Sequence, residues 1–390
     1  MGADAVATSA AAMTHPPGEP LPLRVALVLP SLMVGGAEHH AVKLCRALDR
    51  QAIEPSIVLL RRGLPQELAP LLPADLPVLV APVGRRDPRL VPWLAQQMRA
   101  RQIQVAQSFL WYADAIASAA ALLAPGLRLV CSERGDRRTD YHTATRRAYD
   151  RLITFRRASN IAANSQFGAS LLIRLGALPD RVSVIANGVD MAAAALAEPA
   201  PLRDMLGWPA TAHVVASVSR QVDGKGLDTL IQAVARTGGA DVRVAMIGGG
   251  PLRPALEALA RRLGVQERVA FLGQRSPAIP FLKACDSAVQ LSEETEHCSN
   301  SIIEAMACGR PVVATAVGGN PELVTDGRTG ILVPPRDPAA VAAALLRLAT
   351  DPAAAARMGA RGQEAAGRRY SMDAVAAAYT ALWRTAAARR

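Results

Sequence analysis

The chain has 390 residues, of which 51% are hydrophobic and 20% charged, and its formal net charge is +11 at neutral pH. This length suits two domains of ordinary size, each able to bury its own core. No apolar run reaches the roughly 18 residues of a membrane-spanning helix, so we expect no transmembrane segment. Only 4% of the residues are aromatic, and no zinc-finger, basic-zipper or RNA-recognition pattern is present. We therefore expect no nucleic-acid partner despite the basic charge.

The N-terminal segment and the cysteines indicate where the protein works. Residues 1–20 are rich in Ala and Pro and have neither a basic start nor an apolar centre. We interpret them as a disordered tail rather than a signal peptide. The 5 cysteines form no Cys-x-x-Cys pair. This pattern is typical of reduced thiols in a cytoplasmic protein and predicts neither a zinc site nor a disulfide framework.

Residues 21–190 alternate short apolar runs with helical patterns. The first strand, predicted at Arg24–Leu29, is followed by Gly35-Gly36-Ala37-Glu38 and a helical pattern that ends near Leu48. Further helical patterns occupy Leu90–Arg101 and Ala113–Leu123. The other strands of this half are predicted at Ile53–Leu60, Val78–Ala81, Val105–Ser108, Leu127–Cys131, Ile161–Ala163 and Val182–Ile185. Such alternation indicates an α/β domain whose parallel sheet is covered by helices on both faces.

The segment between residues 128 and 157 holds 9 Arg against 4 acidic residues, with aromatic and aliphatic residues between them. Two interpretations remain open. A helix with one basic and one apolar face can lie on anionic lipid, which would place the protein at the inner face of the plasma membrane. Alternatively, this is an exposed Arg-rich helix that packs on its own sheet.

A second series of strands begins after the Ala- and Pro-rich residues 191–210, which we interpret as a linker. Its strands are predicted at His213–Val218, Val242–Ile247, Val269–Leu272, Ala288–Leu291, Val312–Thr315 and Gly330–Val333. Residues 211–370 are therefore predicted to form a second doubly wound domain. In such domains the ligand loops lie at the carboxyl ends of the strands.

Two cations and a glycine turn follow the first strands of this second domain. Arg220 and Lys225 lie on one glycine-containing loop, and Lys225 is one of only three lysines in a chain with 44 basic residues. Lysine supplies a compact positive charge for phosphate. The next strand runs into Gly248-Gly249-Gly250, but Arg253 replaces the third glycine of a Gly-x-Gly-x-x-Gly fingerprint. A tight turn explains Gly250 as well as a nucleotide contact does.

Residues 292–330 carry most of the functional signal. A polar loop with Glu296 follows the apolar run, and a helix is expected to begin near Ser301 with Glu304 in its first turn. The unpaired N–H groups at this helix start, around Asn300, can hold a diphosphate. Carboxylates would repel phosphates, so these two suit the hydroxyl groups at either end of a nucleotide-sugar. Alternatively, Ser301 and Glu304 form only a capping box.

This stretch resembles the retaining glycosyltransferases of family 4, the glycosyl transferases group 1, which carry a Glu-x7-Glu signature. The resemblance covers Val25 to about Gly330. It implies the GT-B fold, in which two Rossmann-like domains face a cleft. It also implies that Glu296 contacts the donor hexose, that Glu304 contacts the ribose, and that Arg220 and Lys225 bind the donor diphosphate. Glu296, Arg220 and Lys225 are the residues to which we assign catalysis.

The resemblance implies further substrate-binding positions and a closing helix. Residues 371–390 are expected to form a helix that crosses back to the first domain. His297 and Cys298 depart from the family pattern, which has Gly-Phe after the first Glu. No His stands at residues 130–134, where many relatives carry one beside the reacting sugar. The expected substrate-binding residues besides Glu304 are Gly35, Gly36, Gly250, Asn300 and Ser301.

These features predict a retaining glycosyltransferase that moves a hexose from a UDP- or GDP-linked donor to a glycan or lipid-linked acceptor. No Asp-x-Asp pair is present, so we expect no metal and no other cofactor. Two alternatives remain open. A non-catalytic sugar-nucleotide-binding subunit would bind the donor without turnover, and a GT-B epimerase would need His residues and carboxylates lining the cleft.

Overall fold

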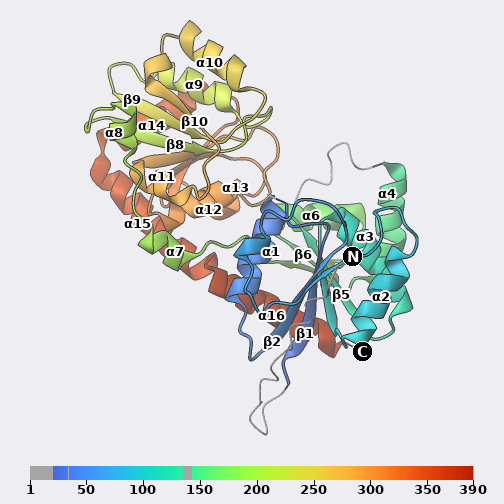
Figure 1. Cartoon of the computed structure of the whole chain (residues 1–390). Helices are drawn as coiled ribbons and strands as arrows, with labels where there is room; N and C mark the ends of the chain where they lie inside the picture. Colours follow the sequence, from blue (N-terminus) through green and yellow to red (C-terminus); the bar gives the residue numbers. More distant parts are fainter. Residues whose placement is uncertain (1–20, 34, 135–142, 390) are drawn as a thin grey trace, which may run out of the picture.

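The computed structural model describes residues 21–33, 35–134 and 143–389. It consists of two α/β lobes, here called the first and second domains (Figure 1). The predicted N-terminal tail and part of the predicted basic segment, residues 135–142, lie outside the described residues.

The first domain is built on a parallel sheet of 7 strands in the order β3-β2-β1-β4-β5-β6-β7. All the strands predicted in this half are found, with ends that differ by a residue or two. The order reverses between β1 and β4, and in open α/β sheets such a reversal marks the place where a ligand crevice is expected, at the carboxyl ends of the strands. The strands are β1 (Leu23–Leu29), β2 (Ile53–Leu59), β3 (Val78–Val80), β4 (Val105–Phe109), β5 (Arg128–Glu133), β6 (Asn160–Ala163) and β7 (Val182–Val184).

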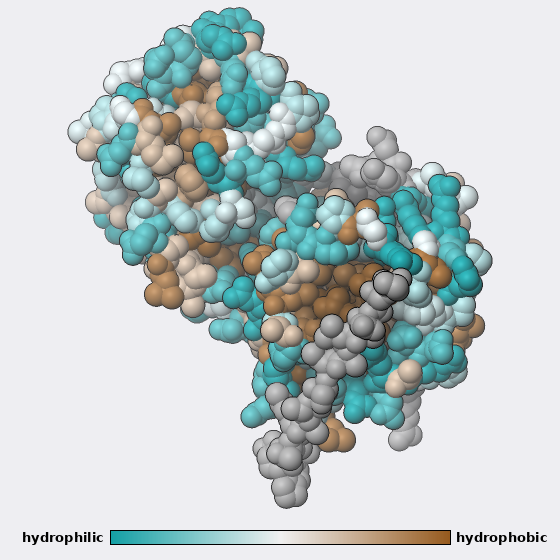
Figure 2. Space-filling model, viewed as in Figure 1, coloured by the Kyte–Doolittle hydropathy of each residue, from teal (hydrophilic) through white to brown (hydrophobic). Residues whose placement is uncertain are grey.

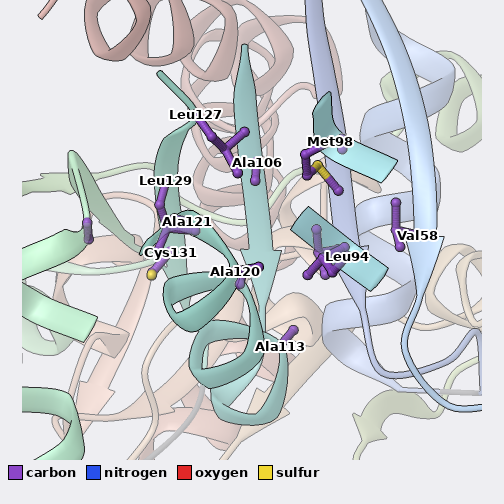
Figure 3. Packing of buried hydrophobic residues seen from close by; sticks show 14 of the residues in the cluster. Val58, Leu94, Met98, Ala106, Ala113, Ala120, Ala121, Leu127, Leu129 and Cys131 are labelled. Carbon is purple, nitrogen blue, oxygen red and sulfur yellow. The ribbon is translucent and has the colours of Figure 1, made fainter. Parts of the chain in front are cut away.

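Helices cover both faces of this sheet. On one face, Ala113, Ala120 and Ala121 lie against the strands, and their small side chains allow the helix that carries them to approach closely (Figure 3). Hydrophilic residues cover much of the outer surface, while hydrophobic residues gather on the first domain in this view (Figure 2). The helices are α1 (Gly36–Ala47), α2 (Leu90–Ala100), α3 (Trp111–Leu123), α4 (Ala144–Tyr149), α5 (Phe155–Arg157) and α6 (Gln166–Leu175).

The second domain has a parallel sheet of 6 strands in the order β10-β9-β8-β11-β12-β13. Its strands lie within one residue of those predicted, because most of them are short apolar runs buried on both faces, as is typical of parallel sheets. The edge strand β10 is mostly half-buried. The order reverses between β8 and β11, so a second crevice is expected there. The strands are β8 (His213–Val218), β9 (Val242–Ile247), β10 (Val269–Gly273), β11 (Ser287–Gln290), β12 (Val312–Thr315) and β13 (Gly330–Val333).

The helices of the second half include two within residues 191–210, which therefore form more than an extended linker. They are α7 (Met191–Leu196) and α8 (Leu202–Leu206). Lys283 donates hydrogen bonds to the carbonyl oxygens of Ala194, Ala195 and Ala197 and so anchors the end of α7. The remaining helices are α9 (Leu227–Ala235), α10 (Arg253–Arg262), α11 (Ile279–Ala284), α12 (Asn300–Ala307), α13 (Asn320–Leu323), α14 (Pro338–Thr350) and α15 (Pro352–Arg369).

The last helix, α16 (Met372–Ala388), leaves the second domain and packs on the first (Figure 1). Tyr379 and Trp383 are fully buried against that domain. The indole Nε1 of Trp383 donates to the side-chain oxygen of Gln107 on β4 at 2.9 Å. Where α16 begins, the N–H of Met372 donates to the carbonyl oxygen of Val189, so two segments of the chain cross side by side.

One bent helix pair is the candidate membrane span found in the described part of the chain. Within the described ranges, no one helix is both long and apolar enough to cross a bilayer. The pair α14 and α15 meets the criteria of length and composition only when its members are joined across their 103° bend.

Candidate active site

The carboxyl ends of β8, β9 and β11 bring the predicted loops together. The glycine turn after β9 holds the loop after β8, since the N–H of Gln221 donates to the carbonyl oxygen of Gly249 at 2.8 Å. A Cβ atom on Gly250 would lie 2.2 Å from the carbonyl oxygen of Gln221, so only glycine fits. The tight-turn interpretation of Gly250 therefore has direct geometric support. Arg220 is exposed on the loop so formed.

Lys225 and Glu296, both predicted as catalytic, are in direct contact. The ammonium Nζ of Lys225 lies 2.8 Å from Oε2 of Glu296, and their side chains are 24% and 18% exposed. The same carboxylate oxygen accepts hydrogen bonds from Gln290 Nε2 at 2.7 Å and from Ser292 Oγ at 2.9 Å. Three donors therefore fix the position of the Glu296 carboxylate. Gln290 and Ser292 were not predicted as site residues.

A glycine pair fixes the backbone that carries Glu296. The N–H of Gly319 donates to the carbonyl oxygen of Glu296 at 2.7 Å. A Cβ atom on Gly318 would lie 2.0 Å from that carbonyl oxygen, and the φ of Gly318 is +55°. Both the close approach and the left-handed backbone require glycine at this position.

The helix α12 begins within one residue of the predicted start, but Glu304 does not lie where it was predicted. The helix begins at Asn300, with Ser299 at the N-cap, and Glu304 is not in its first turn. The Oγ of Ser299 lies 2.9 Å from the Oγ of Ser301 rather than on a backbone N–H. The expected first-turn position of Glu304 and the capping-box alternative are therefore wrong, because Ser299 occupies the cap that the box assigns to Ser301. The Glu304 side chain remains available for another partner.

That partner comes from the first domain. Nζ of Lys43 on α1 lies 3.6 Å from Oε1 of Glu304. Both acids of the Glu-x7-Glu pair thus contact a lysine, Lys225 for Glu296 and Lys43 for Glu304. Lys43 was not predicted as a site residue, although its rarity as a lysine in this Arg-rich chain was a usable signal.

The predicted glycine loop opens α1. Gly35 is the N-cap of the helix, with extended backbone, and Gly36 is its first residue. A Cβ atom on Gly35 would lie 2.3 Å from the carboxylate of Glu38, whereas the space around Gly36 is open. Burial raises the pKa of Glu38. His40 is buried beside Phe109 and Tyr379, and its burial lowers the imidazole pKa well below the usual value, so it is neutral at physiological pH.

The end of β5 occupies the place where the family His was sought. Ser132 faces α16, with its Oγ 3.4 Å from the phenolic oxygen of Tyr379. Nη1 of Arg134 donates to Oδ1 of Asn187 at 3.0 Å. Asn187 in turn donates from Nδ2 to Oδ1 of Asn300 at 2.8 Å and to the carbonyl oxygen of Cys298 at 2.8 Å. Arg134 and Asn187 therefore connect the first domain to the start of α12.

A second connection between the domains involves α6. The carboxylate of Glu322 on α13 accepts hydrogen bonds from the N–H groups of Gln166 at 2.7 Å and Phe167 at 2.8 Å. It thus binds the N-terminal donors of a helix in the other domain, an arrangement favoured by the helix dipole. The ring of His297 lies edge-on to Phe167, with centroids 5.4 Å apart. His297 therefore has a packing role between the domains.

The cysteines lie in protective surroundings. All five cysteines are buried, and none of them forms a disulfide. Burial raises the pKa of Cys298 to about 12, and its Sγ accepts a hydrogen bond from the N–H of Asn187. Burial also raises the thiol pKa to about 12 in Cys45 and Cys285 and to about 11 in Cys308. Among the residues that the structure describes, no group of three or more His, Cys, Asp or Glu side chains is arranged to hold a metal ion.

We expect these thiols to resist alkylation in the native protein. A thiol of pKa near 12 holds about a thousandfold less thiolate at pH 8 than an ordinary cysteine, and the thiolate is the reactive form. Because the fold favours the protonated thiols, the free energy of unfolding should fall as the pH rises above about 8.5. Iodoacetamide labelling at pH 8, with and without denaturant, checks the expected resistance to alkylation. Rapid labelling of Cys298 in the folded protein would contradict it.

Comparisons with known proteins agree with this arrangement. Residues 34–193 match a family model described as Glycosyltransferase Family 4, and residues 212–351 match one described as Glycosyl transferases group 1. The lipopolysaccharide core biosynthesis glycosyltransferase LpsE of Rhizobium meliloti (strain 1021) is 38% identical over 180 residues, covering 46% of this chain and 52% of LpsE. A D-inositol 3-phosphate glycosyltransferase of Corynebacterium efficiens is 36% identical over 267 residues, covering 65% of this chain and 62% of that enzyme.

These curated relatives are thus matched over 52% to 62% of their own length. Among solved structures, that of Anabaena Alr3699/HepE in complex with UDP has a TM-score of 0.82 and 25% identity, covering 93% of this chain and 100% of that one. The two family models fall on the two domains, and the fold matches across both. The chain therefore belongs to the GT-B glycosyltransferases, with its first domain in Glycosyltransferase Family 4 and its second in Glycosyl transferases group 1.

Proposed function

We propose that this protein is a retaining, metal-independent hexosyltransferase that moves a sugar from a UDP- or GDP-linked donor to a glycan or lipid-linked acceptor. The observation that carries the proposal is the contact between Lys225 and Glu296 beside the start of α12. The relatives support the substrate class. The structure of HepE, which is 25% identical to this chain, has been solved in complex with UDP-glucose. LpsE is named for lipopolysaccharide core biosynthesis.

The chemistry assigns a role to each charged group. The bond between the anomeric carbon and the diphosphate oxygen breaks, and the acceptor oxygen bonds to that carbon on the same face. The acceptor proton passes to the leaving diphosphate, so no protein base is needed. Arg220 and Lys225 neutralise the charge that develops on the diphosphate, and the position of Lys225, held by Glu296 and Ser292, lowers the cost of reorganisation. The diphosphate competes with Glu296 for Lys225, which frees the carboxylate to accept hydrogen bonds from the sugar hydroxyls.

The non-catalytic alternative rested partly on His297 and Cys298. The structure gives both residues packing partners, Phe167 for His297 and Asn187 for Cys298. Their departure from the family pattern therefore has a structural cause and does not by itself argue against turnover.

A panel of UDP- and GDP-sugars tests the donor class and the metal requirement together. We expect one donor to raise the melting temperature with EDTA present, and the same donor to support transfer with retained anomeric configuration, measured by NMR. A requirement for added Mg²⁺ would contradict metal independence. The absence of any shift across the panel would contradict the proposed donor class.

We also propose that the Arg-rich surface of the first domain contacts anionic membrane. Leu152 is 63% exposed, and Arg147, Arg151 and Arg156 are exposed in the same segment. Exposed arginines beside an exposed aliphatic side chain suit a surface of anionic lipid. We expect co-sedimentation with vesicles containing phosphatidylglycerol, and its loss in high salt. Equal binding to purely zwitterionic vesicles would contradict this interpretation.

A further inference from the structure

Arg134 is a half-buried cation for which the proposed reaction gives no role. It follows β5 directly, at the carboxyl end of the first sheet. Its Nη1 donates to Asn187, but Nε and Nη2 are shielded from solvent and have no hydrogen-bond partner among the described residues. Burial lowers the pKa of the guanidinium. A buried charge in this state is costly unless something else pairs with it.

The two unpaired nitrogens have a specific geometry. The N–H of Nε and one N–H of Nη2 point in parallel from one edge of the planar guanidinium. This edge receives two oxygens of a phosphate or carboxylate at once, and arginine is favoured over lysine where such paired recognition matters. Nη1 lies in the same plane but away from this edge, and it is the nitrogen that donates to Asn187. One hydrogen bond therefore orients the guanidinium, and its paired edge has no hydrogen-bond partner among the described residues.

The surroundings connect this edge to the donor site. Asn187 bridges Arg134 to Asn300, the first residue of α12, with hydrogen bonds of 3.0 and 2.8 Å. The start of α12 is where the donor diphosphate is proposed to bind. On the first-domain side, the guanidinium carbon lies 5.9 Å from the centre of the Phe109 ring. His40 lies beside the same ring with centroids 6.2 Å apart, and the nearby cation Lys43 pairs with Glu304.

We propose that Arg134 binds a phosphate oxyanion in the cleft through its Nε and Nη2. This rests on the proposed function, since the cleft must receive a sugar nucleotide and an acceptor. The phosphate belongs either to the donor, as its β-phosphate, or to the acceptor. In the first case Arg134 is a third cation on the diphosphate, supplied by the domain opposite Arg220 and Lys225. In the second case it selects acceptors that carry a phosphate.

The test compares Arg134→Gln and Arg134→Lys in the full chain by calorimetric titration. The control is Arg157→Gln, because Arg157 is likewise an arginine that donates to an oxygen of the first domain, the carbonyl oxygen of Ala121, and it has no assigned site role. The probes are UDP, UMP, GDP, GMP and inorganic phosphate. Inorganic phosphate is titrated into protein that is already saturated with whichever of UDP and GDP binds more tightly. Arg134→Lys keeps the charge, so it provides a folded variant if Arg134→Gln is unstable.

If the anion is the donor β-phosphate, Arg134→Gln should weaken nucleoside diphosphate binding about 10- to 100-fold and affect the monophosphate much less. If it belongs to the acceptor, diphosphate affinity should hold while inorganic phosphate binding is lost in both variants. Unchanged binding of every probe in a folded Arg134 variant overturns the proposal, as does equal weakening of all probes. If substitution of Lys225 weakens diphosphate binding but substitution of Arg134 changes the binding of no probe, the role proposed for Arg134 is wrong and the proposed function stands. If the wild type binds none of the nucleotides, the proposed function fails with it.

Discussion

Replacing Lys225 by alanine is expected to lower the rate of sugar transfer about 100- to 1000-fold and to leave the chain folded. The ammonium group contacts Glu296 and Ser292 after β11, at the carboxyl end of the second sheet, where we propose that the leaving diphosphate gains charge. Stability should change little, because Glu296 keeps its hydrogen bonds from Gln290 and Ser292 and is partly exposed. Steady-state kinetics with the donor found in the panel, together with the melting temperature, measure both effects.

Lys283→Ala is the matched control for this variant. Lys283 donates to three carbonyl oxygens at the end of α7 and has no role in the proposed site. Its loss should lower stability and leave the turnover number intact, the reverse of the Lys225 pattern.

Glu296→Ala is expected to abolish transfer as well. Because Lys225 and Glu296 touch, their effects should not add, and the double variant should be little worse than the poorer single one. A rate of transfer close to that of the wild type in either single variant would contradict the proposed mechanism.

Much of the fold follows from local sequence. The strands His213–Val218 and Val242–Ile247 have the predicted ends, because a short apolar run bounded by turn residues has few other ways to bury both of its faces. Glu296 and Lys225 were also recognisable, one from the Glu-x7-Glu spacing and the other as a rare lysine after a strand. Their direct contact was not predicted, because it depends on how two separate loops meet above the sheet.

The rest of the site depends on contacts between distant segments. Arg134 meets Asn187, Asn187 meets Asn300, and Lys43 meets Glu304, and no local pattern specifies such pairings. The error at the start of α12 has a local cause. Ser299 and Ser301 are both suitable caps, and the sequence gives no means to choose between them. The first-domain partners in these pairings, Arg134, Asn187 and Lys43, were therefore missed, although Asn300 and Glu304 were found from their own loop and helix.

The second large effect is expected from Trp383→Ala, which should lower the free energy of unfolding by about 3–5 kcal/mol. Trp383 is fully buried between α16 and the first domain, and its indole donates to Gln107. The substitution leaves a cavity and also deprives a buried amide of its partner. Because α16 packs on α1, which carries Gly35 and Lys43, we expect the first domain to be the part that loosens.

Urea unfolding followed by circular dichroism measures the stability change, and hydrogen exchange in β4 and β5 shows where it falls. Leu196→Ala is a suitable control, since that side chain on α7 is 81% exposed and its truncation should cost little. Faster exchange in the first sheet, with the second sheet unchanged, would show that a helix following the second domain in sequence completes the core of the first. A loss below about 1 kcal/mol for Trp383→Ala would mean that α16 contributes little to that core, and that the first sheet is stable without it.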